Sequence, residues 1–238
     1  MLIAVTCGIR ETKTSSGMLD TNSLVTYFNE LINEQGGTTL IIPPQEILDI
    51  ESIGSKLDGL IITGGGDINP NLYKEKNTDS KNILDARDLT EIKLLNMAEE
   101  NNIRTLAICR GHQMLNVYKG GTLIQDINIH INNPLNHTKI NDKASQYIHE
   151  IEIEETSKLF EILETKNLEV NSIHHQCVDR LGDDLLISAR SSDGVVEAIE
   201  TTSSWEAVGV QWHPEYLEND TESKKLFNWV VKGKTFNH

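Results

Sequence analysis

The chain has 238 residues, 38% of them hydrophobic, which fits one large α/β domain over residues 1–238 better than two small domains. Its 36 acidic residues outnumber its 21 lysines and arginines and give a net charge of -15. This charge argues against nucleic acid and against an anionic membrane as partners, because phosphate-rich surfaces are bound by clustered cations. The composition is that of an ordinary acidic globular protein.

The three cysteines, Cys7, Cys109 and Cys177, lie far apart, and no C-x-x-C pair occurs. Neither a disulfide framework nor a cysteine zinc site is therefore indicated. The chain starts directly with a strand-like segment at residues 2–5, without a basic region ahead of a long apolar run. We predict neither a signal peptide nor a transmembrane segment, and we expect a location in the reducing cytoplasm.

The first half of the chain alternates between predicted strands and helices. Short apolar runs predict strands, and apolar residues at helical spacing predict helices. In chain order these elements are strand 2–6, helix 22–35, strand 38–42, strand 58–63, helix 89–100 and strand 104–109. Strands that are separated by helices predict βαβ units and a parallel sheet.

The second half is richer in strands, which follow one another closely. The expected strands are 147–154, 168–175, 184–190, 195–200 and 207–212. Their spacing favours antiparallel or mixed pairing. The last helix is expected at 220–232, and residues 128–146, rich in Asn, Asp and Lys, are expected to form a surface excursion.

Cys109 stands where the strand at 104–109 ends and an apolar pattern at helical spacing begins. A nucleophile on such a sharp turn is exposed at the carboxyl edge of a parallel sheet. The start of a helix favours the thiolate form of a cysteine, and Arg110 adds a positive charge. Gly111 permits the close backbone approach that the turn requires. The alternative is that Cys109 is a small buried hydrophobic residue.

His213, Pro214 and Glu215 follow the last predicted strand. In extended backbone, residues two apart point to the same side, so Glu215 can orient the imidazole of His213. A base and its orienting acid are two parts of a nucleophile–histidine–acid triad. A polar loop after a core strand is the alternative, but the predicted cysteine turn strengthens the catalytic interpretation.

Three glycines at 64–66 follow another predicted strand. This turn presents backbone N–H groups at the same sheet edge as Cys109, where acyl chemistry needs donors for an oxyanion. A phosphate-binding loop is disfavoured because no G-x-x-x-x-G-K-[ST] motif is present. A flexible turn without a role is the remaining alternative.

The segment 171–176 (NSIHHQ) is densely polar and follows a predicted strand. It is interpreted either as a substrate-binding loop or as a surface turn. Two adjacent histidines without further ligands at familiar spacing do not predict a metal site. No pattern indicates a role for His112, His130, His137 and His149.

Taken together, five segments resemble, in order, the class I glutamine amidotransferase family. They are IITGGGD, AICRGHQMLN, GGTLIQD, NSIHHQ and GVQWHPE, and they cover most of the chain. Within this family, the resemblance is strongest to the stand-alone γ-glutamyl hydrolases of peptidase family C26, typified by γ-glutamyl-γ-aminobutyrate hydrolase. It rests on the ICRG segment, the D-x-N-P-x-x-Y run from Asp67 to Tyr73, and NSIHHQ with VDRL. The resemblance implies a flavodoxin-like three-layer fold: a mostly parallel sheet, helices on both faces and a smaller antiparallel region.

The resemblance also implies roles for individual residues. Cys109 would be the nucleophile, His213 the base and then the acid, and Glu215 the orienting carboxylate. The backbone N–H groups of Gly65 and Arg110 would form the oxyanion hole. The residues expected near the substrate are Gln113, Asn171, Ser172, His174, His175 and Gln176.

The implied activity is hydrolysis of a γ-glutamyl amide through a thioester, with no metal and no organic cofactor. Two alternatives stay open: a glutaminase subunit that supplies ammonia to a separate synthetase, and a non-catalytic binding module. All three expected catalytic residues are present, which disfavours the binding module. No pattern identifies the amine half of the substrate or the oligomeric state, for which a homodimer is one option.

Overall fold

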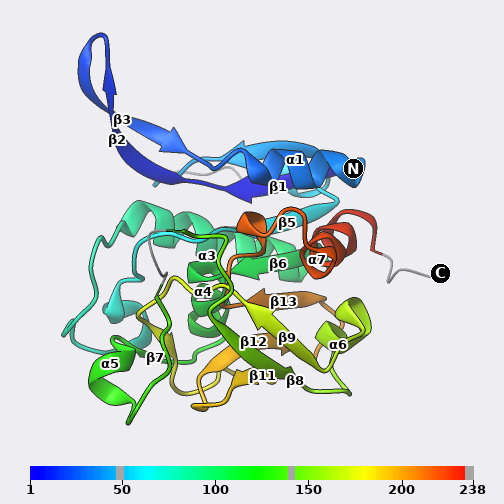
Figure 1. Cartoon of the computed structure of the whole chain (residues 1–238). Helices are drawn as coiled ribbons and strands as arrows, with labels where there is room; N and C mark the ends of the chain where they lie inside the picture. Colours follow the sequence, from blue (N-terminus) through cyan, green and yellow to red (C-terminus); the bar gives the residue numbers. More distant parts are fainter. Residues whose placement is uncertain (47–50, 139–142, 234–238) are drawn as a thin grey trace.

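The computed structural model describes residues 1–46, 51–138 and 143–233, and its centre is a nine-stranded sheet (Figure 1). Five strands are parallel to one another; in sheet order they are β4 (Thr38–Ile42), β1 (Leu2–Thr6), β5 (Gly59–Ile62), β6 (Arg104–Ile108) and β13 (Ala207–Val210). The sheet continues with four antiparallel strands, β12 (Val196–Thr201), β11 (Leu185–Ser191), β8 (His149–Ile153) and β9 (Asn167–Val170). The predicted fold class, with a parallel first half and an antiparallel second half, is confirmed.

Helices cover both faces of the sheet because the buried strands are apolar on both sides. Ile3 and Val5 of β1 belong to one core cluster, and Ala4 between them belongs to the other. The first core is completed by α1 (Tyr27–Glu34), α6 (Lys158–Leu163) and α7 (Thr221–Lys232), and the second by α3 (Asp85–Glu100) and α4 (Arg110–Tyr118). The shorter helices are α2 (Glu51–Gly54), α5 (Ile127–His130), η1 (Pro70–Tyr73) and η2 (Pro214–Tyr216).

The carboxyl ends of β5, β6 and β13 lie side by side at one edge of the sheet. Ile62 of β5 is in register with Ala107 of β6, and Ile108 of β6 is in register with Val210 of β13. Each of the three strands is followed by one of the motifs found in the sequence. Parallel pairing therefore brings together the glycine turn, Cys109 and His213.

An antiparallel hairpin precedes the first helix and takes up residues 22 and 23, the first two residues of the helix predicted at 22–35. It consists of β2 (Gly8–Thr14) and β3 (Gly17–Ser23), and it projects as a ribbon from the sheet (Figure 1). Gly17 closes its turn at a φ of 109°, which favours glycine. The helix itself begins at Tyr27, so the prediction was wrong about its start.

The expected surface excursion at 128–146 is only partly exposed. Its described part contains most of α5 and also His137, whose side chain is 3% exposed, while residues 139–142 lie outside the described residues. Nearby, β7 (Leu123–Ile124) pairs with β10 (Cys177–Val178). In the described parts of the chain, no helix is both long and apolar enough to cross a membrane.

Candidate active site

Cys109 occupies the turn between β6 and α4 in a backbone conformation that non-glycine residues rarely adopt. Its φ is 51° and its ψ is -102°, and its backbone N–H donates to the carbonyl of Val210 at 2.7 Å. Such strain costs on the order of 1–3 kcal/mol and persists only where the surroundings impose it. A Cβ on Gly111 would lie 2.3 Å from the carbonyl oxygen of Ile62, so the predicted need for glycine after the turn is confirmed.

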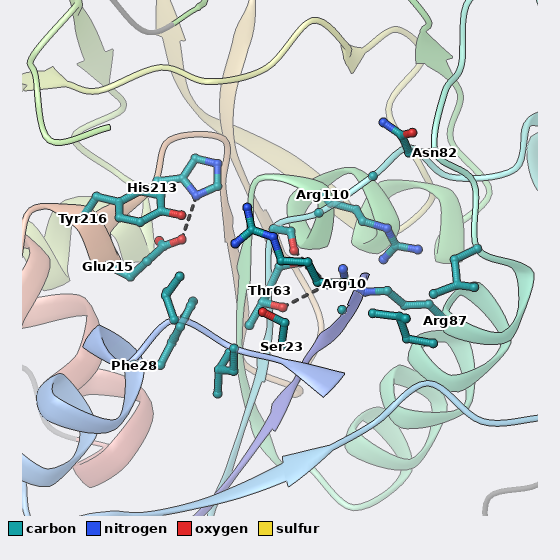
Figure 2. A pocket seen from close by; sticks show the side chains of 18 of the residues that line it. Arg10, Ser23, Phe28, Thr63, Asn82, Arg87, Arg110, His213, Glu215 and Tyr216 are labelled. Carbon is teal, nitrogen blue, oxygen red and sulfur yellow. Dashed lines mark hydrogen bonds and ion pairs between the residues drawn. The ribbon is translucent and has the colours of Figure 1, made fainter. Parts of the chain in front are cut away.

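His213 and Glu215 form a buried pair beside Cys109. His213 Nδ1 lies 2.7 Å from Glu215 Oε1, and the two side chains are 10% and 3% exposed. The ring of Tyr216 lies against the imidazole, with 5.4 Å between the ring centroids (Figure 2). The carboxylate thus holds Nδ1 protonated and leaves Nε2 for chemistry.

The charge state of His213 is set by opposing effects. Burial lowers the pKa of His213, but the charge interactions and hydrogen bonds with Glu215 and Cys109 raise it well above its ordinary value of 6.5. The raised pKa favours the charged form of the imidazole. This arrangement keeps a proton next to the sulfur that would attack a carbonyl.

Asn171 fixes the backbone of His213 rather than facing a ligand. Its Nδ2 donates to the His213 carbonyl at 2.8 Å, and its Oδ1 accepts from the His213 N–H at 2.8 Å. Nδ2 also donates to the carbonyl of Ala144. Asn171 is 1% exposed, so we interpret it as a positioning residue for His213.

The glycine turn after β5 is anchored by Arg87, a residue that the sequence interpretation missed. The guanidinium donates to the carbonyls of Thr63 at 3.0 Å and Gly64 at 2.9 Å. A Cβ on Gly65 would lie 2.1 Å from this guanidinium. Because Arg87 binds the carbonyls, it fixes the orientation of the peptide units whose N–H groups were expected to form the oxyanion hole.

Arg87 belongs to a buried ion-pair network that also holds Arg110. Arg87 pairs with Glu91 at 2.7 Å, and Arg110 pairs with both Glu91 and Asp88. The guanidinium of Arg110 thus faces α3, and its charge is balanced there instead of acting on Cys109 alone. The helix was predicted to begin at residue 89, so Arg87 and Asp88 were not recognised as part of it. Arg87, Asp88 and Glu91 lie on the buried side of α3, and the spacing of four residues between Arg87 and Glu91 was the available signal.

The other residues expected near the substrate are engaged with one another. Gln113 Nε2 donates to the Gln176 carbonyl and to Gln211 Oε1, both at 3.1 Å. Gln176 donates to Ser80 Oγ at 2.9 Å, and Ser172 is buried. The structure thus places the 171–176 segment behind His213 as a polar support.

His174 and His175 diverge although they are adjacent. His174 is buried and donates through Nδ1 to the Gln176 carbonyl at 2.9 Å. His175 is partly exposed and lies between Asp67 at 2.9 Å and Asp126 at 3.4 Å. The hydrogen bond that His175 donates to Asp67 raises the pKa of His175 against the effect of burial.

A cavity of about 590 Å³ opens between the glycine turn, the His213–Glu215 pair and the base of the hairpin (Figure 2). Three arginines line it: Arg10, Arg87 and Arg110. The last two are paired with acids of α3, whereas no carboxylate among the described residues pairs with Arg10. The cavity therefore offers one free positive charge close to His213.

The fold is that of a class I glutamine amidotransferase-type protein. A glutamine amidotransferase of Thermotoga maritima has a similar structure, with a TM-score of 0.58 at 15% identity over 97% of this chain and 94% of that chain. The model of the peptidase C26 family matches residues 1–215, and the chain belongs to this family.

Two relatives illustrate the range of the similarity. The γ-glutamyl-γ-aminobutyrate hydrolase PuuD of Escherichia coli K12 is 36% identical over 216 residues, covering 86% of this chain and 83% of that protein. Protein NtpR of Enterococcus hirae is 33% identical over 233 residues and 94% of both chains. Family and relatives together indicate an enzyme of the hydrolase or amidotransferase type.

Proposed function

We propose that the protein hydrolyses the γ-glutamyl amide bond of a γ-glutamyl amine, with Cys109 as nucleophile. The observation that carries this proposal is the strained turn at Cys109 next to the His213–Glu215 pair, in which the carboxylate lies 2.7 Å from the imidazole and the pKa of His213 is raised. A cysteine beside a charged histidine is an activated nucleophile for acyl transfer.

In the first step the sulfur of Cys109 attacks the γ-carbonyl carbon, and the carbonyl oxygen becomes an oxyanion. The backbone N–H groups of Gly65 and Arg110 are the proposed donors to this oxyanion; one such donor contributes about 2.7–4 kcal/mol to lowering the barrier. Arg87 supports this role because it donates to the Gly64 carbonyl, which belongs to the same peptide unit as the Gly65 N–H. His213 then protonates the leaving amine as the C–N bond breaks.

The second step returns the enzyme to its starting state. A γ-glutamyl thioester remains on Cys109 after the amine has left. His213, now neutral, takes a proton from water, and the resulting hydroxide attacks the thioester carbonyl. Glutamate leaves with the oxygen of water, and the Cys109 thiolate and the His213 imidazolium are restored.

The amine half of the substrate is proposed to carry a carboxylate. Arg10, on the hairpin, lines the cavity together with Tyr216. Burial raises the pKa of Tyr216, and the positive charge of Arg10 partly opposes this rise. A γ-aminobutyrate group ends in a carboxylate that suits such a free guanidinium. An ammonia leaving group, as in glutamine, would leave Arg10 without a partner.

The proposal is tested with a panel of γ-glutamyl-γ-aminobutyrate, γ-glutamyl-butylamine and glutamine, assayed for released glutamate. We expect γ-glutamyl-γ-aminobutyrate to be hydrolysed best. Arg10→Ala should raise its KM about fivefold, which corresponds to about 1 kcal/mol for an exposed ion pair, without affecting γ-glutamyl-butylamine. Lys13→Ala, on the exposed part of the same strand β2, is the matched control.

Two outcomes would contradict the proposal. Turnover of glutamine alone, rising when a synthetase is added, would favour the ammonia-supplying subunit. Binding of all three compounds without glutamate release would favour the non-catalytic module.

A further inference from the structure

Four residues that are distant in the sequence form a buried cluster behind the candidate active site. We call it the histidine cluster; its members are His137, His149, His174 and Glu197. Their side chains are between 0% and 5% exposed. The cluster joins the stretch after α5, the first residue of β8, the loop after β9 and the strand β12.

One nitrogen of each imidazole is directed at the same carboxylate oxygen, Glu197 Oε1. The distances to this oxygen are 3.0 Å from His149 Nε2, 3.4 Å from His137 Nδ1 and 3.8 Å from His174 Nε2. In a tetrahedral zinc site with bonds of about 2.0–2.1 Å, neighbouring ligand atoms lie about 3.3 Å apart. His137, His149 and Glu197 thus offer ligand atoms that all lie within 4.8 Å of one another, and His174 Nε2 lies next to this group, 3.8 Å from Glu197 Oε1.

The second nitrogen of each imidazole is held by an acceptor. His174 Nδ1 lies 2.9 Å from the Gln176 carbonyl, and His149 Nδ1 lies 3.4 Å from the Asn136 carbonyl. His137 Nε2 lies 2.9 Å from Asp193 Oδ2. When these acceptors take the N–H of a neutral ring, the other nitrogen carries the lone pair, as in metal-binding histidines; His149 Nε2, now in hydrogen-bond distance of Glu197 Oε1, would exchange this contact for the ion.

Several buried polar atoms of the cluster have no hydrogen-bond partner in the described parts of the chain, and two of them, His137 Nδ1 and His174 Nε2, face Glu197 Oε1. His137 Nδ1, His174 Nε2 and Glu197 Oε2 are buried and have no hydrogen-bond partner among the described residues. A lone pair that faces a buried carboxylate is repelled by it, and a cation between them removes this repulsion. Glu197 and the neighbouring Asp193 together carry two negative charges, which balance a divalent ion.

We propose that the histidine cluster is a structural site for one divalent metal ion of the zinc class, with the ligands His137 Nδ1, His149 Nε2, His174 Nε2 and Glu197 Oε1. Imidazole and carboxylate suit zinc, and four protein ligands make a closed, non-catalytic site. An open groove lined by Leu135, His149 and Ser191 reaches the cluster at His149. The sequence predicted no metal because the four ligands share no local spacing.

The site would stabilise the segment that supports the candidate active site. His174 lies three residues after Asn171, which holds the backbone of His213. A metal that joins His174 to β12 would thus fix both ends of the 171–174 segment. The inference does not depend on the proposed hydrolase activity, because it is tested by metal content.

The test uses the full chain, purified without a histidine tag, stripped with a chelator and titrated with Zn²⁺. Elemental analysis should find about one zinc per chain. Zinc at about a hundredfold above its Kd should raise the Tm by roughly 5–10 °C. Asp193→Asn should weaken binding about 10–100-fold, since it removes the carboxylate that supports His137 and one of the two negative charges but none of the four proposed ligands. His149→Gln should abolish binding, and His130→Gln, at an exposed histidine, is the matched control.

Two results would overturn the proposal: no zinc uptake and no Tm shift in the unmodified protein, or equal uptake by the unmodified protein and by His149→Gln. Either would mean that the two carboxylates are balanced by protonated histidines alone. If His149→Gln does not fold, the titration of the unmodified protein and of Asp193→Asn still decides the question.

Discussion

Replacing Gly64 by alanine should disable the site through one methyl group. A Cβ at this position would lie 2.6 Å from His213 Cε1, whereas ordinary contacts begin at 3.4 Å. The imidazole cannot easily withdraw, because Glu215 holds Nδ1 at 2.7 Å and Asn171 holds its backbone. The glycine turn cannot withdraw either, because Arg87 holds the Gly64 carbonyl at 2.9 Å.

The structure sets the size of the effect. To restore an ordinary contact, the ring and the methyl group must separate by about 0.8 Å, and a misplacement of about 1 Å costs about a hundredfold in rate. We therefore expect kcat for γ-glutamyl-γ-aminobutyrate to fall about a hundredfold in Gly64→Ala, while the KM changes little.

Steady-state kinetics with released glutamate as the readout measures this change. Gly54→Ala is the matched control, because its methyl group meets only the flexible Met97 side chain, at 3.1 Å, away from the site. A kcat within twofold of the unmodified protein in Gly64→Ala would refute the reasoning.

Three further predictions concern the residues around His213. Glu215→Gln should lower the pKa of His213, measured by NMR titration. The raised pKa of His213 stabilises the fold at pH values below the ordinary imidazole pKa, and this contribution is lost as the pH rises through the raised pKa of the folded protein. The difference in unfolding free energy between the unmodified protein and Glu215→Gln should therefore narrow at high pH. Asn171→Ala should lower kcat about tenfold at unchanged KM and destabilise the fold by about 1–3 kcal/mol, since it leaves buried backbone groups of His213 unpaired. Urea unfolding measures the loss of stability, and Asn171→Asp should keep part of the activity and part of the stability. Arg87→Met should destabilise the protein by about 3–5 kcal/mol in the same assay, because Glu91 loses a buried partner, and a loss below 1 kcal/mol would contradict the network.

The convergence of the main site residues was predictable because each follows a strand of the parallel sheet. The sequence places Cys109 after one strand, the glycine turn after a second and His213 after a third. Parallel strands end at a common edge, so local patterns were enough to bring these residues together.

The support behind the site was not predictable, because it depends on distant partners. Asn171 was expected near the substrate but bonds to the backbone of His213, a contact that no local spacing encodes. Arg87 is charged, and charged residues on helices are usually exposed. It is buried here because Glu91 and the carbonyls of the glycine turn satisfy its donors.

The hairpin was missed for a different reason. Leu24 and Val25 continue the apolar spacing of α1 toward the N-terminus, which extended the predicted helix beyond Tyr27. The threonine-containing strands on either side of Gly17 carried the opposite signal, of a hairpin. This difference matters for function because the hairpin brings Arg10 to the cavity.

The most direct test of the central claim is mass spectrometry of the protein after acid quenching during turnover of γ-glutamyl-γ-aminobutyrate. The account predicts one γ-glutamyl group attached to the peptide that contains Cys109, and neither adduct nor turnover in Cys109→Ala. Glutamate release by Cys109→Ala at the rate of the unmodified protein would contradict it.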